Sequence, residues 1–335
     1  MFSKLVQRDF LSVEPHLRRM PDGELLLVCT CGGTAEPAPE NRTYFWHSAD
    51  EGRTWSARQE LCPGVQRAAY CTEVFVLGER VVAYIALHSG KFTDWTCEMY
   101  ESCDSGHHWK SIGRCLVDGE YTFMRSGIAL AEGGILMPYQ HYPISAEEDA
   151  RLRAEGKYCW NADIDHVESG VMFSRDGYRF EKRGAVKTYF RDQPVRWQWP
   201  EPTIVQLSDG TIAMLLRYNG TGALYRSDSA DGGRSWSQPV RTDIPNPDNK
   251  PQLLRLDGTR IALLNTPNGV CGFEHRNPLE VWVSCDDLRT WKKICVTCFD
   301  GCYSYPSAAL SSDGNSLHIA VDFNRHDVYF LSCGL

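Results

Sequence analysis

The feature that most constrains this chain is a short motif, Ser-x-Asp-x-Gly-x-Thr-Trp, which recurs five times. The copies, some of them degenerate, begin at Ser48, Ser102, Ser174, Ser229 and Ser284. From one motif Asp to the next, the chain advances 54, 72, 55 and 55 residues. A period of about 50 residues is typical of propellers and other repeat arrays. The chain is therefore expected to be built from similar, adjacent units.

Each copy of the motif suits a tight turn between two strands. The Asp side chain can accept hydrogen bonds from backbone N–H groups two residues on, and Gly takes the positive φ angle. Trp packs the turn against neighbouring strands. The copy at Ser284 has Leu288 in place of Gly. The motif is a structural device and by itself carries no chemistry.

A second repeat, of β-hairpins, is interleaved with the first. Six pairs of apolar runs are joined at Gly23, Gly78, Gly133, Gly210, Gly258 and Gly314. Glycine turns between two β-type runs, Asp-Gly above all, indicate hairpins. Each of the first five hairpins is followed by one Ser-x-Asp turn, so the unit is four strands repeated six times. We predict an all-β fold, a six-bladed β-propeller of four-stranded antiparallel blades, filling residues 1–335 as a single domain.

Two departures from the repeat are informative. The sixth unit has no Asp turn, and residues 2–8 are expected to supply its outer strand and close the ring, which removes free sheet edges. The third and fourth hairpin glycines lie 77 residues apart, which marks an insertion around residues 142–165. Ser145 and Glu148 form a capping box there and Gly156 is a stop signal, so we predict one short helix.

Composition narrows the classes of function. Hydrophobic residues make up 42% of the chain, and 10 Trp, 15 Tyr and 13 Phe are ample for a buried core. The net charge of −8 argues against nucleic acid or an anionic membrane as a partner. No run approaches the roughly 18 to 20 apolar residues of a membrane span. Residues 1–10 lack a signal-peptide pattern, so a cytoplasmic protein is expected.

The 14 cysteines are expected to be reduced thiols rather than disulfides. Several lie in apolar strand patterns, where Cys behaves as a small hydrophobic residue. Cys295, Cys298 and Cys302 have a spacing like that of zinc ligands, which leaves zinc as the alternative, but no matching pair follows. We expect no cofactor and no metal.

The topology also predicts where a functional site lies. Hairpin turns and Asp turns share one face, so the open ends of the hairpins and the insertion meet at the other face, where loops can carry function. Counting outward from the turns places polar residues of all six blades there. They include Glu14, His16, Glu73, Arg125, Glu201, Arg217, Lys250, Tyr303, Tyr305 and Asp322.

This mixture of acids, cations and tyrosines suits an anionic, polar ligand. Arginine can bind a carboxylate through two hydrogen bonds. A tyrosine beside a carboxylate can be activated as a nucleophile or a base, since the phenol is otherwise protonated near neutrality. Trp197 and Trp199, just ahead of Glu201, could form a wall that stacks against sugars, or could pack between blades.

At this point the sequence resembles the sialidase superfamily, the Asp-box or BNR-repeat propellers, over essentially the whole chain. The hairpin from Glu201 to Arg217 is similar to the family's Glu-to-Arg hairpin. The resemblance implies that Glu201 modulates a catalytic tyrosine and that Arg217 grips a substrate carboxylate. The segment at Arg276 resembles the one that carries a second carboxylate-binding arginine.

The resemblance also implies roles in the last blade. Tyr305, eight residues before Asp313, matches the position of the nucleophilic tyrosine, and Tyr303 is the alternative. Asp322 falls where the family has a glutamate near the end of the chain.

Two positions depart from the family pattern. Val13 stands where the first arginine of the carboxylate clamp is expected, and residues 32–44 contain no Asp to act as general acid. The candidates for the general acid are therefore His16, Glu36, Glu40 and Asp322.

These observations favour a sialidase-like, exo-acting glycoside hydrolase for acidic or polar terminal sugars, with Tyr305 as nucleophile, activated by Glu201. The partner is then an oligosaccharide or glycoside, and neither nucleic acid nor a membrane. The residues predicted to bind it are Arg217, Arg276, Tyr303, Lys250, Arg125, Glu14, Glu73 and Trp199. Two alternatives stay open: a lyase or hydrolase for uronate-containing glycans, and a non-catalytic carbohydrate-binding propeller.

Overall fold

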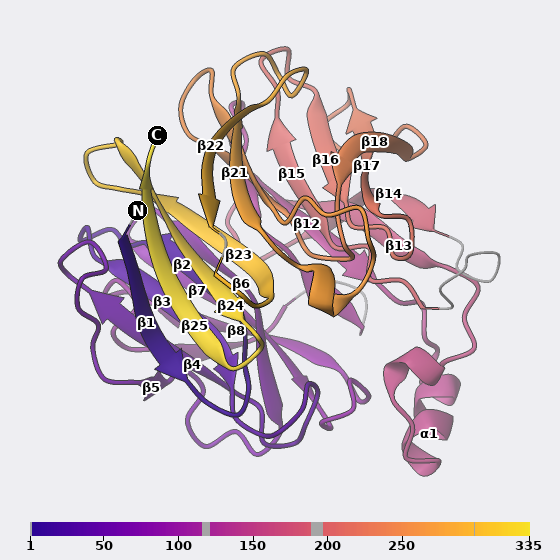
Figure 1. The fold of residues 1–335 in the computed structure, drawn as a ribbon. Coiled ribbons are helices and arrows are strands. Elements are labelled where there is room, and N and C mark those ends of the chain that lie inside the picture. Colours follow the sequence, from indigo (N-terminus) through magenta and orange to yellow (C-terminus); the bar gives the residue numbers. More distant parts are fainter. Residues whose placement is uncertain (1, 116–120, 189–196, 298) are drawn as a thin grey trace.

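Alternating apolar residues and two kinds of turn fold the chain into six antiparallel sheets, the blades of a propeller. The computed structural model describes residues 2–115, 121–188, 197–297 and 299–335. Neighbouring blades pack face to face, so the second strand of a blade is buried on both sides. The predicted all-β propeller is confirmed (Figure 1).

The first three blades follow one another along the chain. The first consists of β2 (Ser12–Arg19), β3 (Leu25–Cys31), β4 (Arg42–Ser48) and β5 (Gln59–Glu60). The second consists of β6 (Ala68–Leu77), β7 (Arg80–His88), β8 (Thr96–Ser102) and β9 (Lys110–Arg114). The third consists of β10 (Thr122–Met124), β11 (Ile128–Ala129), β12 (Ile135–His141), β13 (Val167–Ser174) and β14 (Glu181–Thr188). Its first strand is interrupted, since β10 and β11 both pair with β12.

The remaining blades complete the ring. The fourth consists of β15 (Pro202–Gln206), β16 (Ile212–Leu216), β17 (Ala223–Ser229) and β18 (Val240–Pro245). The fifth consists of β19 (Gln252–Arg255), β20 (Ile261–Asn265), β21 (Leu279–Ser284) and β22 (Lys292–Thr297). The sixth consists of β23 (Tyr303–Leu310), β24 (Ser316–Phe323), β25 (Asp327–Gly334) and β1 (Phe2–Arg8).

The ring closes as predicted, because β1 pairs antiparallel with β25. The two ends of the chain consequently lie side by side (Figure 1). Arg8 Nε and Asp327 Oδ1 are 2.7 Å apart at the end of this pair. Phe330 of β25 packs in one cluster with Leu17 and Trp46 of the first blade, so the junction also has an apolar core.

The Asp side chains accept backbone hydrogen bonds in these turns, but in four copies the donor is the N–H four residues on, and only Asp176 accepts from the N–H two residues on, as expected. In the first copy, Ser48 Oγ accepts from the N–H of Gly52 at 2.8 Å, and Asp50 Oδ1 accepts from the N–H of Thr54 at 2.8 Å. In the copy that lacks glycine, the N–H of Leu288 makes the equivalent bond to Ser284 at 2.9 Å. Leu288 adopts φ 65° there, a conformation that costs a non-glycine residue about 1–2 kcal/mol. Burial of its side chain between blades offsets this cost.

The predicted helix is α1 (Ala146–Ala154), which lies apart from the sheets in Figure 1. Ser145 caps it by accepting from the N–H of Glu148 at 3.1 Å. Leu152 anchors the helix in a cluster with Trp95 and Tyr121 of the second and third blades. The 3-10 helices η1 (Cys159–Asn161) and η2 (Phe273–His275) lie in loops.

The 13 cysteines in the described ranges are all free thiols. Cys298, the middle member of the zinc-like spacing, lies outside those ranges. Within the part of the chain that the structure covers, no helix is both long and apolar enough to span a bilayer.

Candidate active site

A cavity of about 790 Å³ opens where the hairpin ends of the blades meet. All six blades contribute to its lining, which places it on the face predicted from the topology. Its charged side chains are Glu14, Glu36, Arg125, Glu201, Arg217, Arg276 and Arg325, and its large aromatic ones include Tyr70, Phe92, Phe123, Trp160, Trp197, Trp199 and Tyr305.

Tyr305, Glu201 and Arg217 form the centre of the cavity. Glu201 directly precedes β15 and Arg217 directly follows β16, so the pairing of these two strands sets them opposite one another. Arg217 Nη1 donates to Glu201 Oε2 at 2.9 Å. The Tyr305 hydroxyl donates to Glu201 Oε1 at 2.9 Å and accepts from Arg217 Nη1 at 3.3 Å.

A β-bulge aims Tyr305 into the cavity. The register between β23 and β24 shifts between Ser304 and Ser307, and Tyr305 has φ 53°. Such a conformation is strained for a bulky residue and is held by its surroundings. Because of the bulge, Tyr305 leaves the alternation of the strand that would otherwise set its direction.

The electrostatics of the cavity keep the Tyr305 phenol protonated. Burial raises its pKa, and the neighbouring Glu201 carboxylate raises it further. Arg217 and Arg276 oppose this effect without overcoming it. Loss of the phenolic proton therefore requires an acceptor, and Glu201 already holds that proton in a hydrogen bond.

A second charged cluster centres on Glu14, which is 1% exposed. Glu14 also lies in a bulge, with φ 51°. Arg125 and Lys250 both donate to Glu14 Oε1, Lys250 at 2.6 Å, and Tyr70 donates to Oε2 at 2.6 Å. Burial alone would raise the pKa of Glu14, but Arg125 and Lys250 outweigh it and lower the pKa. Glu14 is therefore ionised beside Tyr305, whose ring lies 5.0 Å from Lys250 Nζ.

Arg276 reaches the cavity from the loop that follows η2. Its Nη1 donates to Ser304 Oγ at 2.9 Å and its Nη2 to the carbonyl of Asp248 at 2.6 Å. Burial and the nearby Arg217 lower its pKa. The guanidinium carbon lies 5.8 Å from the centre of the Tyr305 ring. Arg276 thus lies near the Tyr305 ring, whose hydroxyl bonds to Arg217.

Arg325, which the sequence reasoning missed, brings another cation to the cavity. It lies in the turn between β24 and β25 with φ 62° and forms an ion pair with Glu36 of the β3–β4 loop. Burial lowers its pKa to about 10, so it stays charged at neutral pH. The predicted topology could have indicated Arg325, because the turn between β24 and β25 also lies at the open end of a hairpin. Val13, at the position expected for an arginine, is buried in the apolar core.

Five of the residues predicted from counting lie outside the cavity lining, Lys250 directly behind it and four others elsewhere in their blades, which corrects the sequence interpretation. The bulge at Glu14 turns His16 towards the second blade, where its Nε2 is 3.2 Å from the Cys71 carbonyl and burial holds its pKa well below the usual value. A bulge between Cys71 and Glu73 likewise directs Glu73 to an ion pair with Arg18.

The other two are in the last blade. The Tyr303 ring packs against Phe323, and its hydroxyl accepts from the N–H of Phe299 at 2.9 Å. Asp322 is 0% exposed, and burial raises its pKa to about 8 although Arg276 opposes the shift. Among the described residues, neither of its carboxylate oxygens has a hydrogen-bond partner of normal geometry.

Of the other candidates, Trp199 lines the cavity with Trp160 of the insertion and Trp197. Lys250 is buried behind the lining, where it donates a hydrogen bond to Glu14, which does line the cavity. Glu40, an alternative general acid, is exposed outside the lining, whereas Glu36 is part of it. Of the four candidates for the general acid, Glu36 is therefore the one that lines the cavity.

Comparisons with known proteins agree with this architecture. Residues 69–319 match the BNR repeat-like domain family. Sequence comparison with curated proteins finds no match. Among solved structures, the Hadza microbial sialidase Hz136 is similar with 15% identity and a TM-score of 0.76, over 100% of this chain and 68% of that one.

Two further structures extend the comparison. A protein of unknown function from Dyadobacter fermentans has 16% identity and a TM-score of 0.74, over 99% of this chain and 98% of its own. The Trypanosoma rangeli sialidase, in complex with 2,3-difluorosialic acid as a covalent intermediate, has 14% identity and a TM-score of 0.66, over 96% of this chain and 54% of that one. At such identities the likeness concerns the fold alone. The match over residues 69–319 shows that this chain belongs to the BNR repeat-like domain family, and its six blades give it the fold of the sialidases compared above.

Proposed function

We propose that this protein is a sialidase-like, retaining exo-glycoside hydrolase that uses Tyr305 as its nucleophile. The observation that carries the proposal is the hydrogen bond from the Tyr305 hydroxyl to Glu201 Oε1, 2.9 Å long and at the centre of the cavity. A buried phenol needs an adjacent base in order to attack, and Glu201 is in contact with its proton.

The charges of the cavity favour a sugar that carries one carboxylate. Four arginines line it against three glutamates, and Lys250 adds a further cation behind Glu14. Arg217 and Arg276 each have an Nε that, within the described residues, makes no hydrogen bond. Together with Arg325 they offer three guanidinium groups to an anion, even though Val13 removes the arginine expected from the family pattern.

The aromatic side of the cavity suits the rest of such a sugar. Trp160, Trp197 and Trp199 present flat apolar surfaces beside the charged centre. A sugar held between this wall and the arginines would have its carboxylate and its apolar ring face recognised at the same time. Sialic acids have both features, and so do uronic acids.

The proposed reaction has two steps. The Tyr305 oxygen attacks the anomeric carbon while Glu201 takes the phenolic proton, and the bond to the leaving oxygen breaks as Glu36 protonates that oxygen. Water then attacks the glycosyl–tyrosine bond, Glu36 takes the proton of the water, and Tyr305 regains its own from Glu201. Two displacements give retention at the anomeric carbon. A substrate carboxylate that engages Arg325 would release Glu36 from its ion pair for this role.

The test measures release of sialic acid from an aryl sialoside by the full chain. Wild type should turn the substrate over, Tyr305→Phe should abolish turnover, and Tyr303→Phe should retain it, which separates the two candidate nucleophiles. An aryl uronide, and a uronate oligosaccharide monitored for an unsaturated product, test the alternative substrate class. Binding of sialosides without turnover of any of these substrates would reject the hydrolase and leave a carbohydrate-binding propeller.

A further inference from the structure

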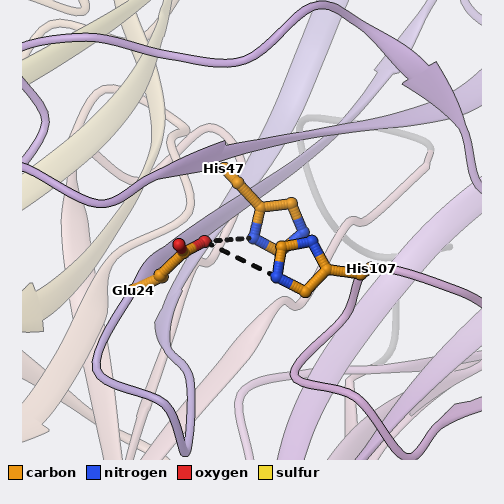
Figure 2. Close-up of side chains that lie close together, drawn as sticks. All are labelled: Glu24, His47 and His107. Atoms are coloured by element: carbon orange, nitrogen blue, oxygen red, sulfur yellow. Dashed lines mark ion pairs between the residues drawn. The ribbon is translucent and has the colours of Figure 1, made fainter.

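Three side chains with metal-binding atoms meet on the face opposite the cavity. Glu24 lies in the hairpin turn between β2 and β3, His47 lies near the end of β4, and His107 lies in the Asp turn that follows β8. Figure 2 shows the Glu24 carboxylate facing both imidazole rings. One ligand atom from each residue lies within 4.8 Å of the others. The cluster therefore joins the first blade to the second.

The distances fit one small ion. Glu24 Oε2 is 3.2 Å from His47 Nδ1 and 3.7 Å from His107 Nε2. Two ligand atoms that are each about 2.1 Å from a tetrahedral zinc ion lie about 3.4 Å from one another. The two observed distances fall on either side of that value. The two imidazole rings are stacked with their centroids 4.0 Å apart and their planes 13° from parallel, so the His107 ring, whose side chain is 43% exposed, has to turn out of the stack for both nitrogens to point at one ion.

The hydrogen bonding of His47 shows which of its two ring nitrogens is free to bind a metal ion. Its Nε2 is 3.2 Å from the carbonyl of Gly106, and a carbonyl only accepts, so Nε2 carries the proton. The lone pair of Nδ1 then faces Glu24. His47 is 6% exposed, and Nδ1 makes no hydrogen bond of acceptable angle in the described structure.

A lone pair that faces a carboxylate is repelled, unless a cation lies between them. A histidine that binds a metal commonly donates its other N–H to a backbone carbonyl, as His47 does to Gly106. Protonation of Nδ1 is the other solution, and it would place a charged ring at a buried position. The orientation of His47 therefore indicates a ligand position.

We propose that Glu24, His47 and His107 form a zinc site that links the first two blades, separate from the hydrolase cavity and independent of the function proposed for it. Two imidazole nitrogens and one carboxylate are a donor set that suits zinc better than calcium or magnesium, which prefer oxygen. The fourth ligand is water or Asp22, whose Oδ2 is 3.7 Å from His107 Nε2. The ion is structural, since it joins the turns of two blades.

The test uses the full chain, stripped of metal and titrated with Zn²⁺ in competition with a chromophoric chelator. The variants are His107→Ala, Glu24→Gln and the matched control His108→Ala, which removes an exposed histidine of the same turn that pairs with Asp104 instead. Loss of a direct ligand should weaken binding by more than the roughly 10- to 100-fold that loss of a ligand's hydrogen-bond partner costs. We expect one tight site in wild type and His108→Ala, with that loss in the other two variants.

Two further readouts do not depend on activity. Co²⁺ should give the visible absorption of a tetrahedral site in wild type and not in His107→Ala, and saturating Zn²⁺ should raise the Tm of wild type but not of that variant. Zinc bound equally well by His107→Ala would place the ion elsewhere, such as on the exposed thiols of Cys103 and Cys285, and would overturn the proposal. Wild type that binds no Zn²⁺ would overturn it too, and would leave a simple ion-paired cluster.

Discussion

The hydroxyl of Tyr305 lies 2.9 Å from Glu201 Oε1, although 104 residues separate the two in the sequence. Tyr305 comes from the first strand of the last blade and Glu201 from the start of the fourth, so the contact forms between two blades that are not neighbours in the ring. Arg217 bonds to both groups and neutralises the carboxylate. The propeller thus brings a tyrosine and a distant glutamate into one hydrogen-bonded group.

Glu201→Gln tests the role of the carboxylate as a base. The amide oxygen of Gln can still accept from Tyr305, but it is a far weaker base. We expect kcat to fall by roughly 10²- to 10⁴-fold with a much smaller change in KM, measured by steady-state kinetics on an aryl sialoside. A circular dichroism spectrum like that of wild type would show that the fold is kept. A change confined to KM would contradict the role of Glu201 in proton transfer.

Arg325→Met tests the third guanidinium group. A hydrogen bond to a charged group contributes about 1.5–3 kcal/mol, so KM for an anionic sugar should rise by roughly 10- to 100-fold. Arg53→Met, an exposed substitution in an Asp turn of the opposite face, is the control and should change KM little. Equal KM values for the two variants would remove Arg325 from substrate binding.

Because of the buried carboxyl of Asp322, we expect the stability of the folded protein to depend on pH. Burial raises its pKa to about 8 in the folded state, whereas an unfolded Asp titrates near about 3.9. Between these values the folded chain binds more protons at this site than the unfolded chain, so its contribution to stability is lost as pH rises from about 4 to about 8. The substitution Asp322→Asn replaces the carboxyl with a group that does not titrate, so the variant does not lose this stability as the pH rises.

The free energy of unfolding should therefore shift in favour of Asp322→Asn, relative to wild type, as the pH rises. The slope should be at most about 1.4 kcal/mol per pH unit, and the difference should become constant above a pH of about 8. Urea unfolding of both proteins across this range measures it. A difference that is independent of pH would show that the Asp322 carboxyl is not protonated in the folded protein.

Gly52→Ala tests the junction that closes the ring. Gly52 has φ 81°, and a Cβ there would lie 2.2 Å from the Phe330 ring of the last blade. Gly23→Ala is a matched control, because Gly23 has φ 92° and open space around the added atom. Both variants should lose about 1–2 kcal/mol to the backbone conformation. Gly52→Ala should lose about 1–3 kcal/mol more to overpacking, and equal losses in thermal unfolding would contradict this junction.

Much of the fold could be predicted because it rests on local turn chemistry. The Asp turns, the hairpin glycines and the cap at Ser145 act within a few residues, so the sequence shows them directly. The pairing of β1 with β25 followed from counting strands. The Glu201 and Arg217 positions could be predicted for the same reason, since a regular hairpin sets residues opposite one another at fixed spacing.

The rest of the site depends on β-bulges, and the alternation of apolar and polar residues along a strand does not reveal where a bulge lies. Glu14 and Tyr305 take positive φ angles, and each bulge reverses the direction of the residues beyond it. This is why His16 was misplaced and why Tyr303 is not in the cavity. Arg325 was missed because the count of hairpin residues ended at Asn324, one residue before it. The Glu24, His47 and His107 cluster was missed because it spans two blades without a recognisable spacing.

The most direct test of the central proposal is to label the nucleophile. The full chain is incubated with 2,3-difluorosialic acid, digested and mapped by mass spectrometry, with Tyr305→Phe alongside. We predict one glycosyl adduct on the peptide that contains Tyr305, and none in Tyr305→Phe. Label on another residue, or wild type that cleaves aryl sialosides yet forms no adduct, would contradict Tyr305 as the nucleophile.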